Sequence, residues 1–259
     1  MRGICTLLAT LALCASAAAR EPYAAIHRDV PRALGVVVLV HGGGWAGPDE
    51  GRQWNIDWWP GSVFRAARWN TVAIDYAARE AGLDSVLGEL RTALASAPHG
   101  RVCVYGESSG GHLALLAAAR LPELRCVITL GAPTDLDRWR DDAARGGDPG
   151  WLGSYAETVP PTFGPGPVDA AWEPFAVASR IAAPVLLAGQ RDDHALPIRG
   201  QLDAFVAARP ATQVVLTDPG AQPYLHGSFS AASRLAFEAR MRAFLQGALH
   251  HPRLSQSAP

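Results

Sequence analysis

The sequence predicts an α/β fold: a mainly parallel, doubly wound sheet with helices on both faces. Apolar runs of strand length alternate with helical patterns along the chain, which is the order of elements that builds parallel sheets. Several of these runs are apolar at consecutive positions, as is typical of strands covered on both faces. The 259 residues suffice to bury one full core, so we expect a single domain.

Each expected element follows from its local pattern. Strands are assigned to apolar, β-branched runs, and helices to stretches whose apolar residues repeat along one face. The expected strands are residues 23–30, 34–40, 71–76, a run that begins at 102, 126–130, 184–189 and 213–216. The expected helices are residues 60–69, 84–97, a helix that ends at 120, 197–208 and 230–249.

Residues 134–180 interrupt this alternation. A glycine-rich segment at 146–150 and a proline-rich segment at 160–167 lie within them. Glycine and proline disfavour regular backbone, so we expect no long helix or strand here. The stretch is interpreted as a lid or cap that crosses the sheet, within a single α/β domain over residues 20–259.

A Gly-x-Ser-x-Gly turn around Ser108 joins an apolar run to an alanine- and leucine-rich helix. Glycine and serine are common in plain turns, so the motif alone is weak evidence, but the flanking strand and helix favour a nucleophile elbow. In such an elbow Ser108 has a strained φ/ψ on a tight turn, which leaves no room for side chains at Gly106 and Gly110. The helix N-terminus then aims N–H groups at an oxyanion formed beside the hydroxyl.

A serine nucleophile needs a histidine base and a carboxylate that orients the base. We expect both just after strands, because ligands gather at the carboxyl ends of parallel strands. Asp192 follows one expected strand and His226 follows the next, so the predicted triad is Ser108, Asp192 and His226. Two neighbours compete for these roles: Asp193 is interpreted as a solvated helix-entry residue, and His194 as a surface or pocket-rim residue.

Three glycines follow His41 at the end of another expected strand. They let the backbone approach a neighbour closely and turn N–H groups inward without obstruction. The N–H groups of Gly43, Gly44 and Ser109 are the predicted oxyanion donors, and each such donor contributes on the order of 3 kcal/mol to transition-state stabilisation. His41 is interpreted as a brace of this loop, and His112 as a packed structural histidine.

Together, the His-Gly-Gly-Gly-Trp segment at 41–45, the Gly-Glu-Ser-Ser-Gly-Gly-His segment at 106–112 and the spaced Asp192 and His226 resemble the α/β-hydrolase superfamily. The resemblance covers residues 34–249. It is greatest to esterases with a His-Gly-Gly-Gly motif, which include hormone-sensitive-lipase-like carboxylesterases and arylformamidase-like enzymes. It implies that the serine, histidine and aspartate form a catalytic triad, with the glycine loop as the oxyanion hole.

Two features depart from the hormone-sensitive-lipase-like pattern. Those enzymes usually carry Asp before and Ala after the nucleophile, where this chain has Glu107 and Ser109. Their N-terminal cap has no room between Arg20 and Leu34. The departures favour a compact esterase and leave the subfamily open.

The expected function is that of a serine esterase, which cleaves carboxylic esters of small acyl or aryl substrates through an acyl-enzyme and needs no cofactor or metal. Hydrolysis of N-formyl arylamides or of small peptides uses the same machinery and stays open, as does a non-catalytic binding protein on a hydrolase scaffold. A net charge of −1 and a pI near 6.7 argue against nucleic acid as a partner. The 23 lysine or arginine positions are all arginine, which excludes a lysine nucleophile. The oligomeric state is left open.

Residues 1–19 have the pattern of a secretory signal peptide: an arginine, an apolar stretch and an alanine-rich end that suits cleavage before Arg20. The apolar stretch is short for a stable membrane span. We therefore expect an exported protein, periplasmic or secreted, with a lipoprotein acylated at Cys14 as the alternative. Cys103 and Cys126 are expected to be buried free thiols, because adjacent parallel strands seldom have disulfide geometry.

Overall fold

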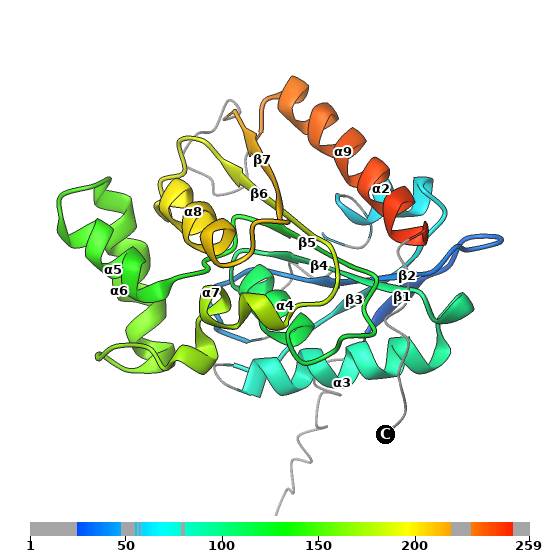
Figure 1. The fold of residues 1–259 in the computed structure, drawn as a ribbon, viewed down its shortest axis with the longest axis horizontal. Coiled ribbons are helices and arrows are strands. Elements are labelled where there is room, and N and C mark those ends of the chain that lie inside the picture. Colours follow the sequence, from blue (N-terminus) through cyan, green and yellow to red (C-terminus); the bar gives the residue numbers. More distant parts are fainter. Residues whose placement is uncertain are drawn as a thin grey trace, which may run out of the picture.

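The structure, a computed structural model, describes residues 25–47, 55, 57, 59–78, 81–218 and 229–250. The expected signal peptide, the Cys14 alternative and His226 lie outside these residues. Within them, one sheet of seven strands lies between two layers of helices (Figure 1).

The sheet is parallel except at one edge. Its strands are β1 (Ile26–Arg28), β2 (Val36–Val40), β3 (Asn70–Ile74), β4 (Val102–Glu107), β5 (Cys126–Leu130), β6 (Val185–Gln190) and β7 (Gln213–Thr217). They are arranged in the order β1-β3-β2-β4-β5-β6-β7. Of these described strands, only β1 runs antiparallel to its neighbour, which is β3. The strand β4 therefore lies at the centre, between β2 and β5.

Helices cover both faces of the sheet. They are α2 (Gly61–Ala66), α3 (Ala81–Ser96), α4 (Ser109–Ala118), α5 (Leu136–Ala144), α6 (Pro149–Phe163), α7 (Pro174–Val177), α8 (Ile198–Ala208) and α9 (Ala231–His250), with short 3-10 turns η1 (Pro98–Gly100), η2 (Ala170–Trp172) and η3 (Ala178–Arg180). Figure 1 shows α2 and α9 on one face, α3, α4 and α8 on the other, and α5 with α6 together at one end. Among the described residues, no helix combines the length and the apolar character needed to cross a bilayer.

Two apolar clusters fill the space between the sheet and its helices. Successive strand residues point to opposite faces, and β2 and β5 are buried at every position, which accounts for their continuous apolar runs. One cluster, under α3 and α4, includes Val104 and Leu113. The other, under α2 and α9, includes Phe64 and Phe237. The sheet is thus shielded on both faces.

Residues 134–180 contain a long helix, so the expectation that this stretch holds no long regular element is wrong. The helix α6 has 15 residues and includes Pro160 and Pro161. Each of these prolines lacks the N–H for one intrahelical hydrogen bond, but both lie in the last turn, so the three turns before them keep their hydrogen bonds. At the other end, Asp148 caps the helix by accepting the N–H of Gly150 at 2.8 Å. The Asp148 side chain stabilises the N-terminus of the helix, and the prolines affect only its last turn, so the helix can form.

Cys103 and Cys126 form a disulfide, which corrects the expectation of free thiols. The two residues are direct partners in register on the neighbouring parallel strands β4 and β5. Their Cα atoms are 4.7 Å apart, inside the range that a disulfide spans, and both side chains point to the same face. The bond ties the central strand to its neighbour.

Candidate active site

Ser108 occupies the turn between β4 and α4 in a strained backbone conformation. Its φ of 51° and ψ of −125° lie in a region that residues with a side chain rarely adopt. The turn is held on both sides, because the N–H of Ser108 donates to the Leu130 carbonyl at 2.8 Å and its carbonyl accepts from the N–H of His112 at 3.1 Å. The residue is only partly buried. This is the geometry of a nucleophile elbow.

Glycines flank this turn because backbone segments touch there. A Cβ on Gly106 would overlap the carbonyl group of Gly110. A Cβ on Gly110 would in turn overlap the carbonyl oxygens of Val40 and His41 at the end of β2. Any side chain at either position would push the turn out of shape. The Gly-x-Ser-x-Gly spacing is therefore a packing requirement of this strand–turn–helix junction.

The glycine loop, residues 42–44 after β2, lies beside the elbow. A Cβ on Gly42 would stand 3.1 Å from the Cβ of Ser108, so the two segments are in contact. Gly43 and Gly44 have φ values of 113° and 62°, which favour glycine. Within the described part of the chain, no residue accepts a hydrogen bond from either N–H. Both N–H groups can therefore donate to a ligand.

A hydrogen-bonded network braces the glycine loop. The buried ring of His41 has Nε2 3.0 Å from Asp75 Oδ1 and Nδ1 2.6 Å from the carbonyl oxygen of Gly42. Tyr76 stacks on this ring, with the centroids 4.5 Å apart. Its hydroxyl lies 3.1 Å from the Gly42 carbonyl oxygen and 3.1 Å from Ser109 Oγ. The network links Ser109, the residue after Ser108, to the glycine loop.

His112 is a buried structural histidine. Its Nδ1 accepts the indole N–H of Trp45 at 3.2 Å, and its Nε2–H donates to the carbonyl oxygen of Trp172 at 2.8 Å. Burial lowers the pKa of His112 to about 4, so the ring is neutral at neutral pH. His112 therefore fixes Trp45, the residue after the glycine loop, against α4.

The loop after β6 presents its two aspartates differently. Asp192 is exposed to solvent, whereas Asp193 is only 4% exposed. The Oδ1 atom of Asp193 accepts the N–H groups of Ala195 at 2.8 Å and Leu196 at 3.2 Å, which fixes the orientation of the carboxylate. A carboxylate that orients a base must be shielded and held in place, and of the two aspartates Asp193 has both properties.

The cap, residues 134–180 between β5 and β6, contacts this loop through the first turn of α6. Asp148 pairs with the ring of His194. The indole N–H of Trp151 donates to the backbone carbonyl of Asp193 at 2.8 Å. The loop that carries both aspartates is thus bonded to the cap.

The same helix also contacts the glycine loop. Thr158, in the middle of α6, faces Gly44: a Cβ on Gly44 would stand 2.6 Å from Cγ2 of this threonine. Phe163, the last residue of α6, packs edge-on against Trp45, with ring centroids 5.2 Å apart. One helix therefore reaches from the aspartate loop to the glycine loop.

Glu173 anchors the cap internally. Its buried carboxyl group accepts the N–H groups of Leu136 at 2.8 Å and Asp137 at 3.2 Å, which begin α5. Burial raises the pKa of Glu173 to about 8. The Glu173 carboxyl group therefore binds the N-terminus of α5 and is mostly protonated at neutral pH.

The structure brings the predicted nucleophile Ser108 and the predicted donor glycines together at the carboxyl ends of β4 and β2. His226 lies outside the described residues, so its role as the base stays a prediction. The contacts of Tyr76 with the glycine loop were not predicted, although its position directly after a strand next to β2 could have indicated a place near the site. The contact of Trp151 with Asp193 was not predictable, because the sequence did not indicate the helix α6.

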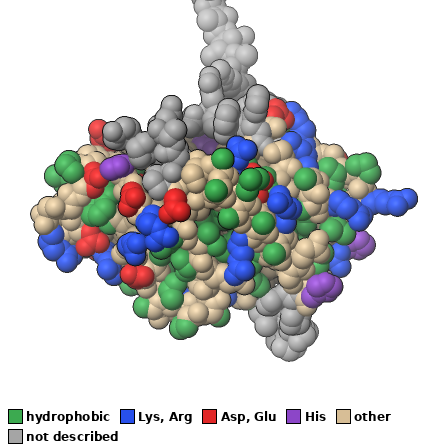
Figure 2. All heavy atoms as spheres, turned by 90° about the horizontal axis from the view of Figure 1, so that it is seen from above, with side chains coloured by type: hydrophobic (Ala, Val, Ile, Leu, Met, Phe, Trp, Pro, Cys, Tyr) green, Lys and Arg blue, Asp and Glu red, His purple; other side chains and the backbone are tan. Residues whose placement is uncertain are grey.

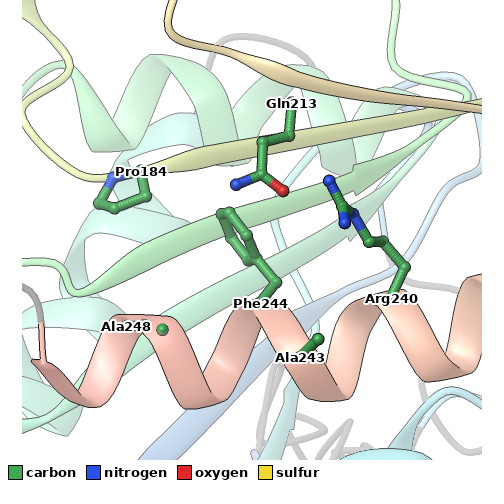
Figure 3. Close-up of a pocket in the computed structure, with 7 residues that line it drawn as sticks. Pro184, Gln213, Arg240, Ala243, Phe244 and Ala248 are labelled. Atoms are coloured by element: carbon green, nitrogen blue, oxygen red, sulfur yellow. The ribbon is translucent and has the colours of Figure 1, made fainter.

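A groove of about 330 Å³ lies apart from this site, between α9 and the sheet (Figure 3). Figure 3 shows Phe244 projecting from α9 toward the strands, with the polar ends of Gln213 and Arg240 beside it. Pro184 precedes β6 and Gln213 begins β7, so the groove lies at the amino ends of these strands. Ser108 follows the carboxyl end of β4, so it lies at the opposite ends of the strands from the groove. The groove is therefore not part of the candidate active site.

The surface charge of the protein is mixed. On the face seen in Figure 2, arginine and acidic side chains of the described residues lie interspersed. The net charge of the whole chain is −1. Neither observation gives an electrostatic argument for a polyanionic partner.

No family model and no curated protein matches the sequence. The structure, however, is similar to several solved ones. Carboxyl esterase 2 from the fungus Tuber melanosporum aligns with a TM-score of 0.69 at 16% identity, over 87% of this chain and 82% of that chain. An esterase of the bacterial hormone-sensitive lipase family aligns with a TM-score of 0.65 at 18% identity, over 88% of this chain and 86% of that chain. EstE5, in a crystal soaked with p-nitrophenyl butyrate, aligns with a TM-score of 0.66 at 18% identity, over 88% of this chain and 82% of that chain. The chain has the α/β-hydrolase fold.

Proposed function

We propose that the protein is a serine esterase that hydrolyses carboxylic esters of small acyl or aryl substrates. The observation that carries the proposal is the backbone of Ser108, whose φ of 51° and ψ of −125° hold a hydroxyl at the tip of a strand–turn–helix junction. Backbone strain of this kind is concentrated at active sites, where the surrounding structure holds it in place. The esterases that share the fold support the same reaction class.

In the proposed reaction, His226 takes the proton of Ser108 while the serine oxygen attacks the ester carbonyl carbon. The oxyanion of the tetrahedral intermediate accepts the N–H groups of Gly43, Gly44 and Ser109. His226 then gives the proton to the leaving alcohol, and the acyl-enzyme forms. Water, deprotonated by the same histidine, attacks the carbonyl carbon of the acyl-enzyme, and the acid leaves as His226 returns the proton to Ser108 Oγ. The available N–H groups of the glycine loop support this assignment.

We propose Asp193 as the residue that orients His226, with Asp192 as the rival that sequence order alone favoured. The burial of Asp193 and its two backbone hydrogen bonds support this choice. We expect Asp193→Asn to lower kcat by at least about a hundredfold, and Asp192→Asn to change it less than about threefold. Steady-state kinetics on both variants distinguish the residues, and the reverse ranking returns the role to Asp192.

The main test is hydrolysis of p-nitrophenyl butyrate by the wild type and by Ser108→Ala. We expect the variant to lose roughly a thousandfold or more in kcat and to escape labelling by a fluorophosphonate probe. Ser96→Ala, a matched change at an exposed serine at the end of α3, controls for the substitution itself. Equal turnover by wild type and Ser108→Ala removes Ser108 from the mechanism. An N-formyl arylamine assayed in parallel shows whether amides are the better substrates.

We also propose that the protein is exported after removal of residues 1–19. The Cys103–Cys126 disulfide supports this proposal, because such bonds persist in oxidising compartments. Mass spectrometry of the mature protein from its native host should give an N-terminus at Arg20. A mature protein that keeps its first residues and stays in the cytoplasm contradicts the proposal, and a lipid mass on Cys14 replaces it with a lipoprotein.

A further inference from the structure

We propose that Trp151, supported by the Asp148–His194 pair, is a positioning residue that holds the catalytic carboxylate in place. Trp151 touches no reacting atom, and it acts through the loop that carries Asp193. The proposal rests on the proposed function, since it takes Asp193 as the acid of the triad. The proposal gives the cap, residues 134–180, a role in positioning a catalytic group.

The first contact is the hydrogen bond from the indole N–H of Trp151 to the backbone carbonyl of Asp193, at 2.8 Å. Trp151 is itself held, because its own carbonyl accepts the indole N–H of Trp139 at 3.2 Å. The Trp139 ring belongs to α5 and is buried. The hydrogen bond to Asp193 thus comes from a residue whose backbone is itself bonded to a buried side chain of α5.

The second contact flanks the first. Asp148 accepts the N–H of Gly150 with one oxygen and pairs with the His194 ring through the other. The Gly150 hydrogen bond, with a further contribution from His194, holds the pKa of Asp148 below its usual range, so the pair keeps its carboxylate. Gly150 also lies so close to the backbone of His194 that a Cβ there would overlap its carbonyl oxygen. Three residues of one helical turn therefore contact two consecutive residues of the loop.

These contacts differ in kind from those that the Asp193 carboxylate makes to Ala195 and Leu196. The latter lie within the loop, so they fix the side chain relative to the loop alone. The contacts from α6 connect the loop to a separate element, which also packs on the glycine loop through Thr158. A catalytic carboxylate must be held within fractions of an ångström, and a shift of about 1 Å costs up to about a hundredfold in rate. The first turn of α6 supplies this restraint.

The test is a double-mutant cycle between Trp151→Phe and Asp193→Asn, with p-nitrophenyl butyrate as substrate. In the wild-type background we expect Trp151→Phe to lower kcat about tenfold with KM changed less than about twofold, because an orienting group is displaced. In the Asp193→Asn background the same change should cost less than about twofold, because the carboxylate to be positioned is already gone. Gly153→Ala, a change in the same helix at an exposed position where an added Cβ meets no atom within 4 Å, should leave kcat within about threefold of the wild type.

Each possible outcome either supports the proposal or overturns it. An undiminished loss in the Asp193→Asn background shows a merely structural role and overturns the proposal, as does an unchanged kcat for Trp151→Phe. Should Trp151→Phe melt below the assay temperature, the cycle is run with His194→Ala, which removes the partner of Asp148, and additive losses overturn the proposal there too. Wild-type activity of Asp193→Asn contradicts the proposed acid itself. Loss of fluorophosphonate labelling in Ser108→Ala reports on the proposed nucleophile independently of Trp151.

Discussion

Gly42 and Ser108 meet at van der Waals distance across the candidate active site. A Cβ on Gly42 would stand 3.1 Å from the Cβ of Ser108 and 3.3 Å from the carbonyl oxygen of Glu107. The contact sets how close the glycine loop approaches Ser108. It leaves space for a hydrogen atom at this position, whereas a methyl group requires the loop or the turn to shift.

Gly42→Ala should therefore separate the oxyanion donors from Ser108. We expect kcat for p-nitrophenyl butyrate to fall about tenfold or more, because donors of this kind act only at hydrogen-bond distance. The control is Gly88→Ala on α3, where an added Cβ meets no atom within 4 Å. That variant should keep the wild-type kcat and gain up to about 1 kcal/mol in the free energy of unfolding. Wild-type kinetics for Gly42→Ala contradict the assigned role of the glycine loop.

Tyr76→Phe should loosen the glycine loop without changing its shape. The variant loses the hydroxyl that contacts the Gly42 carbonyl and Ser109 Oγ, so we expect kcat to fall several-fold and stability to fall by about 1 kcal/mol. Tyr105→Phe is the matched control, because the buried hydroxyl of Tyr105 has no hydrogen-bond partner in the described structure. Its stability should be unchanged or higher. Urea unfolding and kinetics compare the two, and equal effects exclude the proposed brace.

Reduction of the Cys103–Cys126 disulfide should destabilise the protein. The bond closes a loop with a sequence separation of 23, for which the chain-entropy model gives roughly 3 kcal/mol. Because both cysteines are fully buried, we expect the reductant to act only once the protein opens. Urea unfolding with and without a phosphine reductant measures the difference. Alkylation of Cys103 and Cys126 after denaturation without reductant would show that the bond is absent.

Glu173 should make a contribution to the free energy of unfolding that decreases as the pH rises from 5 to 8. The pKa of its carboxyl group is raised to about 8 in the folded state, so the folded protein keeps a proton that the unfolded chain loses above its ordinary pKa of 4.5. Rising pH then favours unfolding, by at most about 1.4 kcal/mol per pH unit. Glu173→Gln removes this contribution, so its free energy of unfolding should depend less on pH. His112 acts in the opposite direction below its ordinary pKa of 6.5, but it is present in both proteins and cancels in the comparison. Identical pH profiles contradict the assignment.

The sheet and the elbow were predictable because their residues carry local signals. The strand β5 occupies the predicted residues 126–130, since an uninterrupted apolar run can be buried on both faces only as an inner strand. The turn at Ser108 was predictable because its Gly-x-Ser-x-Gly spacing, the apolar run before it and the alanine- and leucine-rich stretch after it all lie in one short segment of the sequence.

Other features depend on contacts that the sequence does not display. The adjacent Asp192 and Asp193 are chemically identical, and only the turn of the loop decides which carboxylate is buried. The pairing of Cys103 with Cys126 required the register of two strands. The helix α6 was missed because prolines argue against a helix by composition, whereas their position near its end makes them tolerable.

The two-ended attachment of α6 bears on how a substrate would enter. A hinged lid uncovers a site and leaves its catalytic groups intact, but this helix is bonded to the Asp193 loop at its start and packed on the glycine loop further along. To swing away, it would have to release both loops and so dismantle the machinery it exposes. We therefore expect α6 to stay in place during turnover, and a substrate to reach Ser108 by a route that does not require this helix to move.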